Sequence, residues 1–412
     1  MKRIVAKFGG TSIGDGELLR KAAKSVRDQY EAGNQVIVIV SAMGSTTDVL
    51  LEAAEGGTQG ETSPQELDEI LSMGEKISAR AFASTLRSLG VDSKPILPEH
   101  SDWPVITDNE FGNATPDLEK TRELTQEKII PLLENNTVPV ICGFVGKNHE
   151  GDITTLGRGG SDITAFLIGK CAEANEVIIV TDAEGVMSAD PRRINDPEIL
   201  EEVTADELCD LARYGARILH RNALSYKDPD INARIIHFQH GNLSAKGTTI
   251  TGEIKGGIEM NTELYPEPLA MLTVVGEEMQ TVPGILIKAI NPLSEANINI
   301  FGVSIGPRSF SLYTTEKKSQ EALEILHDSV ENDEVMKSAT NKEGVAMIVT
   351  ESEKFIDTPG IIRKLSKPLA ENGINVLEIY SSQASISFFL NWEDREEAFE
   401  LLKKVMKEVE SK

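Results

Sequence analysis

Short apolar segments alternate with longer amphipathic segments along residues 1–262 of this chain. The short segments are continuously apolar, which is typical of parallel strands buried on both faces. The longer segments have the periodicity of helices that bury one side. The predicted strands are Ile4–Phe8, Val36–Val40, Val138–Cys142, Val177–Thr181 and Ala233–Phe238, and the predicted helices cover about residues 16–32, 64–89, 117–134, 161–174 and 204–225. This alternation predicts an α/β fold, a three-layer sandwich around a mainly parallel sheet.

Two of the predicted helices begin with capping sequences. Ser63-Pro64 combines an N-cap residue with a proline in the first turn. Thr204 and Glu207 have the spacing of a capping box, in which each residue satisfies a backbone N–H group near the other. These residues predict where the two helices start.

Beyond the first 262 residues the pattern changes and then repeats. Residues 261–268 contain two prolines and no periodicity, which predicts a linker. The strand-like segment Leu269–Val275 then leads to Val282-Pro283-Gly284-Ile285, and Val345–Thr350 leads to Thr358-Pro359-Gly360-Ile361. This internal repeat predicts two small β-α-β-β-α units.

Two complete βαββαβ units would need one strand more than this pattern supplies. Residues 333–340 or another segment would have to contribute it, so we expect the units to be interleaved or paired. The expected domains are residues 1–262, followed by α+β units at 269–340 and 344–412.

Composition and charge narrow the range of partners. The 412 residues include 66 acidic and 41 basic side chains, a net charge of −25, which argues against nucleic acid as a partner. The three cysteines lie far apart and the six histidines form no ligand-spaced set, so we expect neither disulfides nor a resident metal site. Lys7 interrupts the apolar start, and no segment has the length of a membrane span. We therefore expect a cytoplasmic protein without a membrane partner.

Four of the predicted strands are followed by small or polar residues. In a parallel sheet these strand ends meet at one edge, where ligands bind. One such loop is also typical of an ordinary turn, but four at one edge predict a binding site. The loops contain Lys7 with Gly9-Gly10, residues 41–48, residues 143–146, and Thr181-Asp182.

The first of these loops has the features of a phosphate site. A lysine at the end of a buried strand is costly to bury unless an anion meets it. The glycines Gly9 and Gly10 let backbone N–H groups approach that anion, and the helix that begins near residues 15–17 would point its positive end there. The alternative for this stretch alone is an ordinary turn with a surface lysine.

A second glycine-rich stretch, residues 154–162, carries an arginine between glycines. Arg158 is therefore free to bind a carboxylate or phosphate through its two-pronged guanidinium. Ser161 and Asp162 follow at the start of a predicted helix, and either could be a simple N-cap. Capping does not account for the arginine and the three glycines before it.

Glu75 lies on the apolar stripe of the helix predicted over residues 64–89, which includes Leu67, Ile70, Leu71, Ile77, Ala81 and Phe82. It follows Leu71 by four residues and precedes Phe82 by seven, so it shares their side of the helix. A carboxylate on that side needs a cation or hydrogen-bond donors, unless the stripe reaches solvent there. The neighbouring Gly74 makes room, which favours a ligand.

Two further stretches contain candidate nucleotide contacts. Residues 181–192 combine an acidic strand end with a glycine- and proline-containing loop, which suits a nucleotide or its metal but is also typical of a long connection. Arg217 lies in the next predicted helix, where it would reach a phosphate or simply face solvent.

Together these stretches resemble aspartate kinase, of the amino acid kinase superfamily, and the C-terminal repeats look like its two ACT regulatory modules. The resemblance covers essentially the whole chain, and no homoserine dehydrogenase portion follows, so the chain resembles the monofunctional kind. The matching pieces, in family order, are Lys7-Phe8-Gly9-Gly10-Thr11-Ser12, Val40-Ser41-Ala42, Ser72-Met73-Gly74-Glu75, Gly143-Phe144, Thr155-Leu156-Gly157-Arg158-Gly159-Gly160-Ser161-Asp162, Val180-Thr181-Asp182, Ala189-Asp190-Pro191-Arg192 and Tyr214-Gly215-Ala216.

The resemblance implies transfer of the γ-phosphoryl group of ATP, with Mg²⁺, to the side-chain carboxylate of L-aspartate, the first step toward lysine, threonine and methionine. The implied catalytic residues are Lys7, Arg158 and Asp162; the implied aspartate contacts are Ser41, Thr47, Glu75, Phe144, Arg158 and Ser161; and the implied ATP contacts are Lys7, Phe8, Gly9, Gly10, Thr181, Asp182, Met187, Arg192 and Arg217. Met187 and Arg217 depart from the Tyr and Lys that the family often has, which implies altered ATP affinity.

The resemblance also implies regulation and assembly through the ACT units. An amino-acid effector, lysine or threonine, would bind near Val282, Gly284, Ile285, Asn297 and Asn299. The chain would form a homodimer or a larger homo-oligomer. Two other functions fit the sequence: a kinase of a different amino acid, and a catalytically silent amino-acid sensor, which the changes at positions 187 and 217 would favour.

Overall fold

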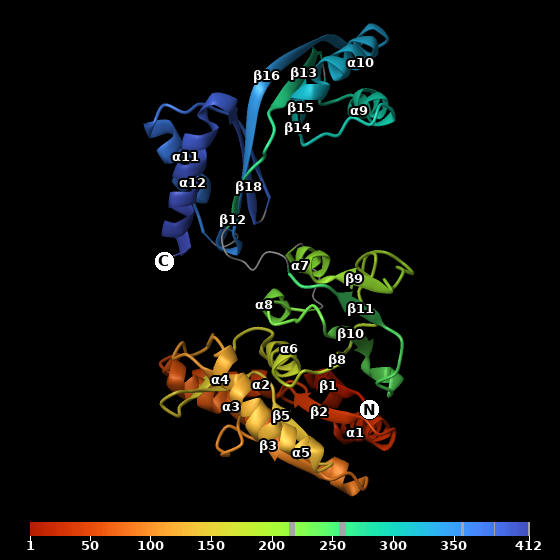
Figure 1. The fold of residues 1–412 in the computed structure, drawn as a ribbon, viewed down its shortest axis with the longest axis vertical. Helices are drawn as coiled ribbons and strands as arrows, with labels where there is room; N and C mark the ends of the chain where they lie inside the picture. The colour runs from red at the N-terminus through yellow and green to blue at the C-terminus, as the bar shows by residue number, and fades with distance from the viewer. Residues whose placement is uncertain (214–218, 255–260, 278, 356–357, 383, 411–412) are drawn as a thin grey trace. The chain divides into compact units, whose positions relative to one another are not determined.

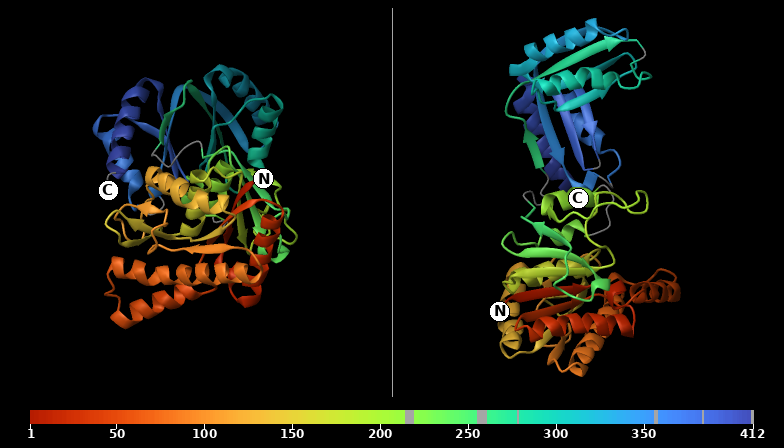
Figure 2. Two further views of the ribbon diagram at one scale, coloured as in Figure 1. Left: turned by 60° about the horizontal axis from the view of Figure 1, so that its bottom comes forward. Right: turned by 90° about the vertical axis from the view of Figure 1, so that its right-hand side faces the viewer.

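A computed structural model describes residues 1–213, 219–254, 261–277, 279–355, 358–382 and 384–410. The chain divides into two compact units, Met1–Gly257 and Ile258–Lys412. Figures 1 and 2 show both units as ribbons. Each unit is described below by itself.

The first unit is a three-layer sandwich built on an eight-stranded sheet. The strand order is β3 (Ser93–Ile96), β5 (Val138–Cys142), β2 (Gln35–Val40), β1 (Arg3–Phe8), β8 (Glu176–Thr181), β10 (Asn232–His237), β11 (Thr248–Thr251) and β9 (Glu202–Thr204). Among these described strands, only β10 and β11 pair antiparallel. All five predicted strands are confirmed and form the centre of the sheet. The edge strands β3 and β9, and the strand β11 beside β9, were not predicted, because they are short and polar.

Helices cover both faces of this sheet. The helices α1 (Gly16–Glu31) and α3 (Pro64–Ser88) pack on one face, and α6 (Gly160–Cys171) packs on the other (Figure 1). The remaining helices are α2 (Thr46–Thr58), α4 (Leu118–Leu124), α5 (Ile130–Glu134), α7 (Ala205–Arg213) and α8 (Arg221–Leu224). The fold class predicted from the apolar pattern is therefore confirmed.

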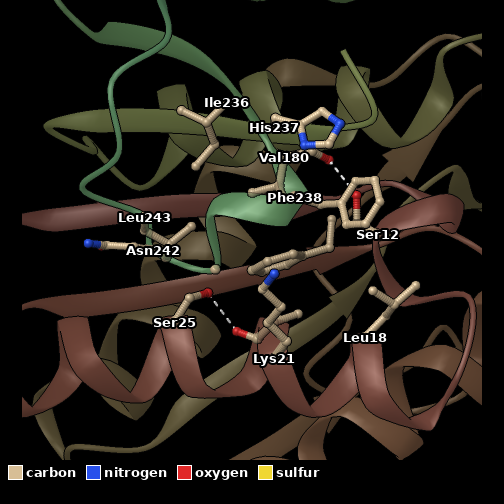
Figure 3. A pocket seen from close by; sticks show the side chains of 13 residues that line it. Ser12, Leu18, Lys21, Ser25, Val180, Ile236, His237, Phe238, Asn242 and Leu243 are labelled. Carbon is tan, nitrogen blue, oxygen red and sulfur yellow. Dashed lines mark hydrogen bonds between the residues drawn. The ribbon is translucent and has the colours of Figure 1, made fainter. Parts of the chain in front are cut away.

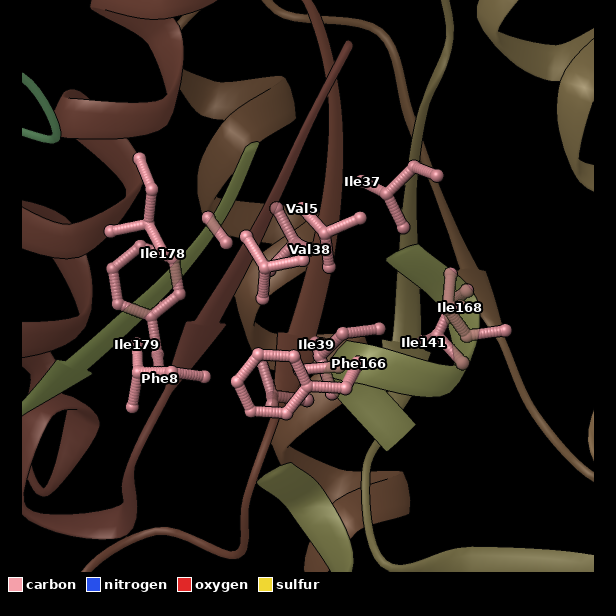
Figure 4. Packing of buried hydrophobic residues seen from close by; sticks show 14 of the residues in the cluster. Val5, Phe8, Ile37, Val38, Ile39, Ile141, Phe166, Ile168, Ile178 and Ile179 are labelled. Carbon is pink, nitrogen blue, oxygen red and sulfur yellow. The ribbon is translucent and has the colours of Figure 1, made fainter. Parts of the chain in front are cut away.

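Buried aliphatic and aromatic side chains fill the space between the layers. Figure 4 shows side chains of β1, β2 and β8 packed with Phe166 and Ile168 of α6. The Phe8 ring lies 5.1 Å from the Phe82 ring of α3, which joins the sheet to the other helix layer. Both faces of the central strands are thus buried, as their continuous apolar sequences require.

The helix starts predicted from capping sequences are confirmed. The Ser63 hydroxyl accepts from the N–H of Glu66, whose carboxylate accepts from the N–H of Ser63. Thr204 and Glu207 exchange the same pair of hydrogen bonds. Each box satisfies backbone N–H groups that have no partner within the helix.

Two of the predicted helices are interrupted. The segment predicted over 117–134 contains a π-helical turn at Thr125–Ile129, just before Pro131, whose missing N–H group breaks the regular hydrogen-bond series. The segment predicted over 204–225 contains α7 and α8, and residues 214–218 lie outside the described residues.

Gly74 lets α3 approach the loop after β2. A methyl group at Gly74 would lie only 2.7 Å from the Cβ atom of Ala42. Gly74→Ala would normally stabilise a helix by about 1 kcal/mol, but here we expect it to destabilise the protein by about 1–3 kcal/mol through overpacking. Gly56 of α2 has nothing within 4 Å of that position, so Gly56→Ala is the matched control and should be stabilising. Urea denaturation measures the free energy of unfolding of both variants, which should fall in Gly74→Ala and rise in Gly56→Ala.

A small three-stranded sheet lies beside the main one and contributes to the site. It consists of β4 (Ile106–Thr107), β6 (Val145–Asn148) and β7 (Ile153–Thr155), in that order. The glycine-rich loop of residues 156–159 follows β7 directly and leads into α6.

The second unit contains a single seven-stranded sheet. Its elements are β12 (Asn261–Leu264), β13 (Leu269–Gly276), α9 (Ile285–Glu295), β14 (Gly302–Ile305), β15 (Ser309–Thr315), α10 (Ser319–Glu331), β16 (Met336–Glu351), α11 (Ile361–Glu371), β17 (Val376–Ser381), β18 (Ser385–Asn391) and α12 (Arg395–Glu410). The 16-residue strand β16 runs through both repeats: its first half pairs with β13 and its second half with β18.

The fourth strand of the second repeat comes from the start of the unit. Asn261–Leu264 pairs antiparallel with the second half of β16, from Asn261 opposite Glu351 to Leu264 opposite Ile348. The prediction of a linker over residues 261–268 is therefore wrong for its first half. The free edge of β16 and the half-buried Leu264 favour a strand there, which local sequence does not reveal.

Candidate active site

A nearly buried ion pair lies at the carboxyl edge of the main sheet. The Nζ atom of Lys7, from the end of β1, lies 2.7 Å from the Oδ1 atom of Asp162, and the two side chains are 10% and 12% exposed. Asp162 belongs to the first turn of α6, on the other side of a glycine-rich loop. Two residues selected from motifs far apart in the sequence thus contact each other.

The Gly9-Gly10 turn folds tightly against the neighbouring strand ends. The N–H of Gly9 donates to the carbonyl of Val180, and the N–H of Gly44 donates to the carbonyl of Gly10. A Cβ atom at Gly10 would lie 2.6 Å from the carbonyl oxygen of Ala42, so no other residue fits without displacing backbone. The glycines bring three strand ends together around Lys7.

The predicted start of α1 is confirmed. A 3-10 turn, Gly10–Ile13, follows the glycines, and α1 begins at Gly16. The carboxylate of Asp15 caps it by accepting from the N–H groups of Glu17 and Leu18. These N–H groups therefore already have a partner, and the orientation of α1 toward the site stays a prediction.

Glu75 is buried on α3, with only 3% of its surface exposed. Its Oε1 atom accepts from the N–H of Ala42 at 3.0 Å, and its Oε2 atom has no hydrogen-bond partner among the described residues. The room beside Gly74 is taken by Ala42, and Ile77, predicted on the same stripe, is 52% exposed. The buried carboxylate is confirmed, whereas part of the predicted stripe is wrong.

Burial raises the pKa of Glu75 to about 7 from its ordinary 4.5, although the hydrogen bond from Ala42 opposes the change. A raised pKa in the folded protein means that folding favours the protonated form. The stabilising contribution is therefore complete below pH 4.5 and is lost as the pH rises through 7.

We expect this loss to reach about 3 kcal/mol, at about 1.4 kcal/mol for each pH unit between the two pKa values. Urea denaturation of the ligand-free protein between about pH 4.5 and pH 8 measures it, with Glu75→Gln as the reference, since glutamine does not titrate. If the free energy of unfolding changed with pH equally in wild type and Glu75→Gln, the raised pKa of Glu75 would be contradicted.

The loop before α6 leaves Arg158 exposed. Arg158 has no hydrogen bond or ion pair among the residues that the structure describes. The N-cap of α6 is Gly159, in the left-handed conformation with φ 73°, and no side chain caps this helix. The alternative in which Ser161 or Asp162 serves as the N-cap is therefore excluded.

The other implied acceptor contacts lie on neighbouring loops. Phe144, with φ 65°, donates its N–H to the hydroxyl of Thr164, and Ser161 is buried against Gly143. Ser41 is half-buried and donates its N–H to the carbonyl of Phe8. Thr47 is half-buried in the first turn of α2.

The implied nucleotide contacts are only partly available. Phe8 is a core residue, so its side chain cannot contact ATP. Thr181 and the exposed Asp182 lie at the end of β8, and Met187 forms a bridge with Ile199. Arg192 is exposed and donates three hydrogen bonds to Asp190, two from its side chain and one from its backbone N–H, which hold the pKa of that carboxyl at about 2. Arg217 lies outside the described residues.

A cavity of about 10 Å³ lies behind the Gly9-Gly10 turn, between α1, β1 and residues 236–243 (Figure 3). Its lining includes Ser12, whose hydroxyl donates to the carbonyl of Val180. This volume has room for about one water molecule. The cavity is therefore too small to be a nucleotide site.

Sequence reasoning missed Asp68. Its side chain is 1% exposed and accepts three hydrogen bonds from residues near the site. It precedes Glu75 by seven residues, two helical turns, and so lies on the same side of α3. The seven-residue spacing of two acidic residues on the buried side of one helix could have identified Asp68 from the sequence.

The implied effector residues lie at opposite ends of α9. Val282, Gly284 and Ile285 form the turn at its start, and Asn297 and Asn299 follow its end. An 11-residue helix is about 16 Å long. One amino acid therefore cannot contact both groups within a single chain.

A search for membrane spans among the described residues finds no helix both long and apolar enough to cross a bilayer.

Comparisons with known proteins agree with this architecture. The amino acid kinase family profile matches residues 2–237, and the ACT domain profile matches residues 264–328 and 341–404. An aspartokinase of Thermus thermophilus is 31% identical over 409 residues, 97% of each chain. An aspartokinase of Mycobacterium tuberculosis is 30% identical over 401 residues, 94% of this chain and 92% of that one.

Solved structures share the fold. The aspartate kinase of Synechocystis superposes with a TM-score of 0.79 at 24% identity, over 98% of this chain and 69% of that one. Aspartokinase III of E. coli, in complex with aspartate and ADP, has a TM-score of 0.55 at 23% identity, over 98% and 99% of the two chains. The full-length match to curated aspartokinases, together with both profiles, shows that the chain belongs to the amino acid kinase family as an aspartokinase with C-terminal ACT domains.

Proposed function

We propose that the chain transfers the γ-phosphoryl group of ATP to the side-chain carboxylate of L-aspartate and so forms 4-phospho-L-aspartate, the first step toward lysine, threonine and methionine. The observation that carries the proposal is the nearly buried Lys7–Asp162 pair at 2.7 Å, beside the Gly9-Gly10 turn. A structural relative, E. coli aspartokinase III, binds aspartate and ADP.

The chemistry of this reaction suits the residues at the sheet edge. An anionic carboxylate must approach an anionic triphosphate, so catalysis consists of positioning and charge neutralisation. The Lys7 ammonium would neutralise charge on the transferring oxygens, and the Asp162 carboxylate holds its Nζ atom in place. No protein base is required, because the acceptor carboxylate is ionised at neutral pH.

Two groups are available for the rest of the acceptor. The Arg158 guanidinium has no partner among the described residues and would bind the α-carboxylate through two parallel hydrogen bonds. The free Oε2 atom of Glu75 would accept from the α-ammonium, whose charge would lower the pKa of Glu75 on binding. Ser41, Thr47, Phe144 and Ser161 complete the proposed set.

ATP would bind beyond the ends of β1 and β8. Thr181 and Asp182 lie there, Gly9 and Gly10 shape the phosphate side, and Met187, Arg192 and Arg217 complete the proposed contacts. Arg192 would have to leave Asp190 to reach a phosphate.

Mg²⁺ would arrive with the nucleotide. In kinases this ion keeps several waters and is bound by one or two carboxylates together with substrate phosphates. Asp162 and Asp182, at the sheet edge, fit that requirement. Among the described residues, one set of three metal-ligand side chains lies close together, His327, Asp328 and Glu331, and it belongs to α10 of the other unit. The ion would supply additional charge neutralisation at the phosphates.

We also propose feedback control by lysine or threonine at the ACT units. E. coli aspartokinase III, whose fold is similar, has been solved in complex with lysine and aspartate. Because α9 separates the two groups of implied effector residues, a site that uses both would need two copies of the chain. The homodimer or larger assembly that this requires is supported by the edge strand β14, whose Val303 and Ile305 side chains are exposed.

The cytoplasm remains the proposed location. Cys142, Cys171 and Cys209 are buried and unpaired, which is typical of proteins in a reducing compartment.

A coupled ADP-release assay tests the proposed function. The purified chain with ATP and Mg²⁺ should release ADP with L-aspartate far faster than with L-glutamate or other amino acids, and lysine or threonine should reduce the rate. Faster release with another acid would identify a different amino acid kinase. No release with any acid would favour an amino-acid sensor, and equal rates with and without both effectors would remove the proposed feedback.

A further inference from the structure

Asp68 joins three elements near the site. Its Oδ2 atom accepts from the N–H groups of Gly112 and Thr155, both at 2.9 Å, and its Oδ1 atom accepts from the Thr155 hydroxyl at 2.6 Å. Asp68 itself belongs to α3 and is 1% exposed. A buried carboxylate is strongly unfavourable unless its oxygens accept hydrogen bonds, and here both oxygens do.

Of the two segments that Asp68 binds, one leads directly to Arg158 and the other is joined to it. Thr155 is the last residue of β7 and precedes Arg158 by three positions. The carbonyl of Thr155 accepts from the N–H of Ala114, so the loop around residues 110–114 is joined to the same strand end. That loop also packs against Gly157, where a Cβ atom would lie 2.5 Å from the Oδ1 atom of Asn113. The start of the Arg158 loop is therefore fixed from two sides.

The helix that carries Asp68 also carries Glu75. The two residues are seven positions apart on α3, a rise of about 10 Å along one side of the helix. Glu75 binds the loop after β2 through Ala42, and Asp68 binds the end of β7. The helix α3 thus holds the loop of Arg158, which is proposed to bind the α-carboxylate of the acceptor. The same helix carries Glu75, which is proposed to bind its α-ammonium.

We propose that Asp68 is a positioning residue: by hydrogen-bonding Thr155 and Gly112, it sets the Arg158 loop at a fixed place relative to Glu75 and so determines the affinity for the acceptor amino acid. This inference rests on the proposed function, because it assigns the acceptor to Arg158 and Glu75. Asp68 contacts no reacting atom and acts through the loop alone.

Two substitutions of Asp68 separate the effect of its hydrogen bonds from the effect of its negative charge. An asparagine at position 68 would place its carbonyl oxygen where Oδ2 accepts from two N–H groups, and its amide nitrogen would donate to the Thr155 hydroxyl, which can also accept. Asp68→Asn should therefore keep the loop in place without the negative charge. Asp68→Ala removes every acceptor, and Thr155→Val removes only the hydroxyl donor.

The test measures KM for L-aspartate, KM for ATP and kcat in the full chain. Asp68→Ala should raise KM for aspartate by about 10–100-fold, since small misplacements of binding groups cost this much, while KM for ATP changes less than about 2-fold. Thr155→Val should raise KM for aspartate by about 3–10-fold, and Asp68→Asn by less than either. If Asp68→Ala does not fold, the Thr155→Val and Asp68→Asn values decide.

Asn148→Ala is the matched control. Asn148 is buried on β6 of the same small sheet and accepts from the N–H groups of Glu150 and Asp152, but among the described residues no hydrogen bond joins it to Thr155 or Asp68. This variant should lower the urea midpoint and leave KM for aspartate unchanged. An unchanged KM in Thr155→Val and Asp68→Ala, or an equal rise in Asp68→Asn and Asp68→Ala, would overturn the inference. Wild-type protein that releases no ADP with aspartate would instead contradict the proposed function, before any variant is compared.

Discussion

Replacing Lys7 with alanine should reduce kcat by about 10³-fold or more. The loss is large because the Lys7 ammonium is a preorganised positive charge in a nearly buried site, where such groups stabilise a developing negative charge most strongly. KM for both substrates should change less than kcat, because the stabilised charge develops in the transition state. Steady-state kinetics with L-aspartate and ATP measure both effects.

The control for this variant is Lys227→Ala. Lys227 is also buried, but its Nζ atom donates to the carbonyls of Asp228, Ile231 and Gly252 rather than to a carboxylate at the sheet edge. Lys227→Ala should lower stability and keep kcat within about 3-fold of wild type. Near-normal turnover in a folded Lys7→Ala variant would refute the role assigned to Lys7.

Replacing Arg158 with alanine should raise KM for L-aspartate by about 100-fold. Truncation of one partner of a hydrogen-bonded charge pair typically costs about 2–5 kcal/mol, and Arg158 is proposed to pair with the α-carboxylate. Arg158→Lys should recover only part of the affinity, since an ammonium keeps the charge but not the planar two-pronged geometry. KM for ATP should stay within about 3-fold of wild type in both variants.

Arg27→Ala is the control for Arg158, because Arg27 is a surface arginine of α1 paired with Asp28 and Glu31. It should leave both KM values unchanged. A fall in kcat at constant KM for aspartate in Arg158→Ala would place Arg158 at the transferring phosphoryl group instead of the acceptor.

The central sheet could be predicted because its strands β5, β2, β1, β8 and β10 each have one continuous apolar sequence. Val36–Val40, for example, has no polar residue to place in solvent, so a strand buried on both faces is the arrangement that its sequence favours. The strand β11, Thr248–Thr251, gives no such signal, since its pairing depends on β10 and β9 rather than on its own residues. The helix α2 was missed because Thr46, Thr47, Gly56 and Gly57 are weak helix formers.

Site residues could be predicted where a charged side chain falls in a segment that is buried, because burial of an unpaired charge is strongly unfavourable. Lys7 at the end of a buried strand and Glu75 on a buried helix side both need a partner, and the structure gives Lys7 the carboxylate of Asp162 and Glu75 the N–H of Ala42. The partners of Asp68 could not be predicted, because Gly112 and Thr155 are 44 and 87 positions away. The pairing of Arg192 with Asp190 also shows that a motif residue can bind its own loop.

The path of β12 limits where the C-terminal half can be cut. Because Asn261–Leu264 supplies the outer strand beside residues 348–351, a fragment that starts at residue 269 or 344 would leave the hydrogen-bonding groups of that strand edge open to other molecules. Such fragments should self-associate through this edge and form larger aggregates, whereas a fragment that starts at residue 258 should form no assembly larger than that of the full chain at the same concentration. Regulatory fragments for crystallisation or ligand screening should therefore begin before Asn261.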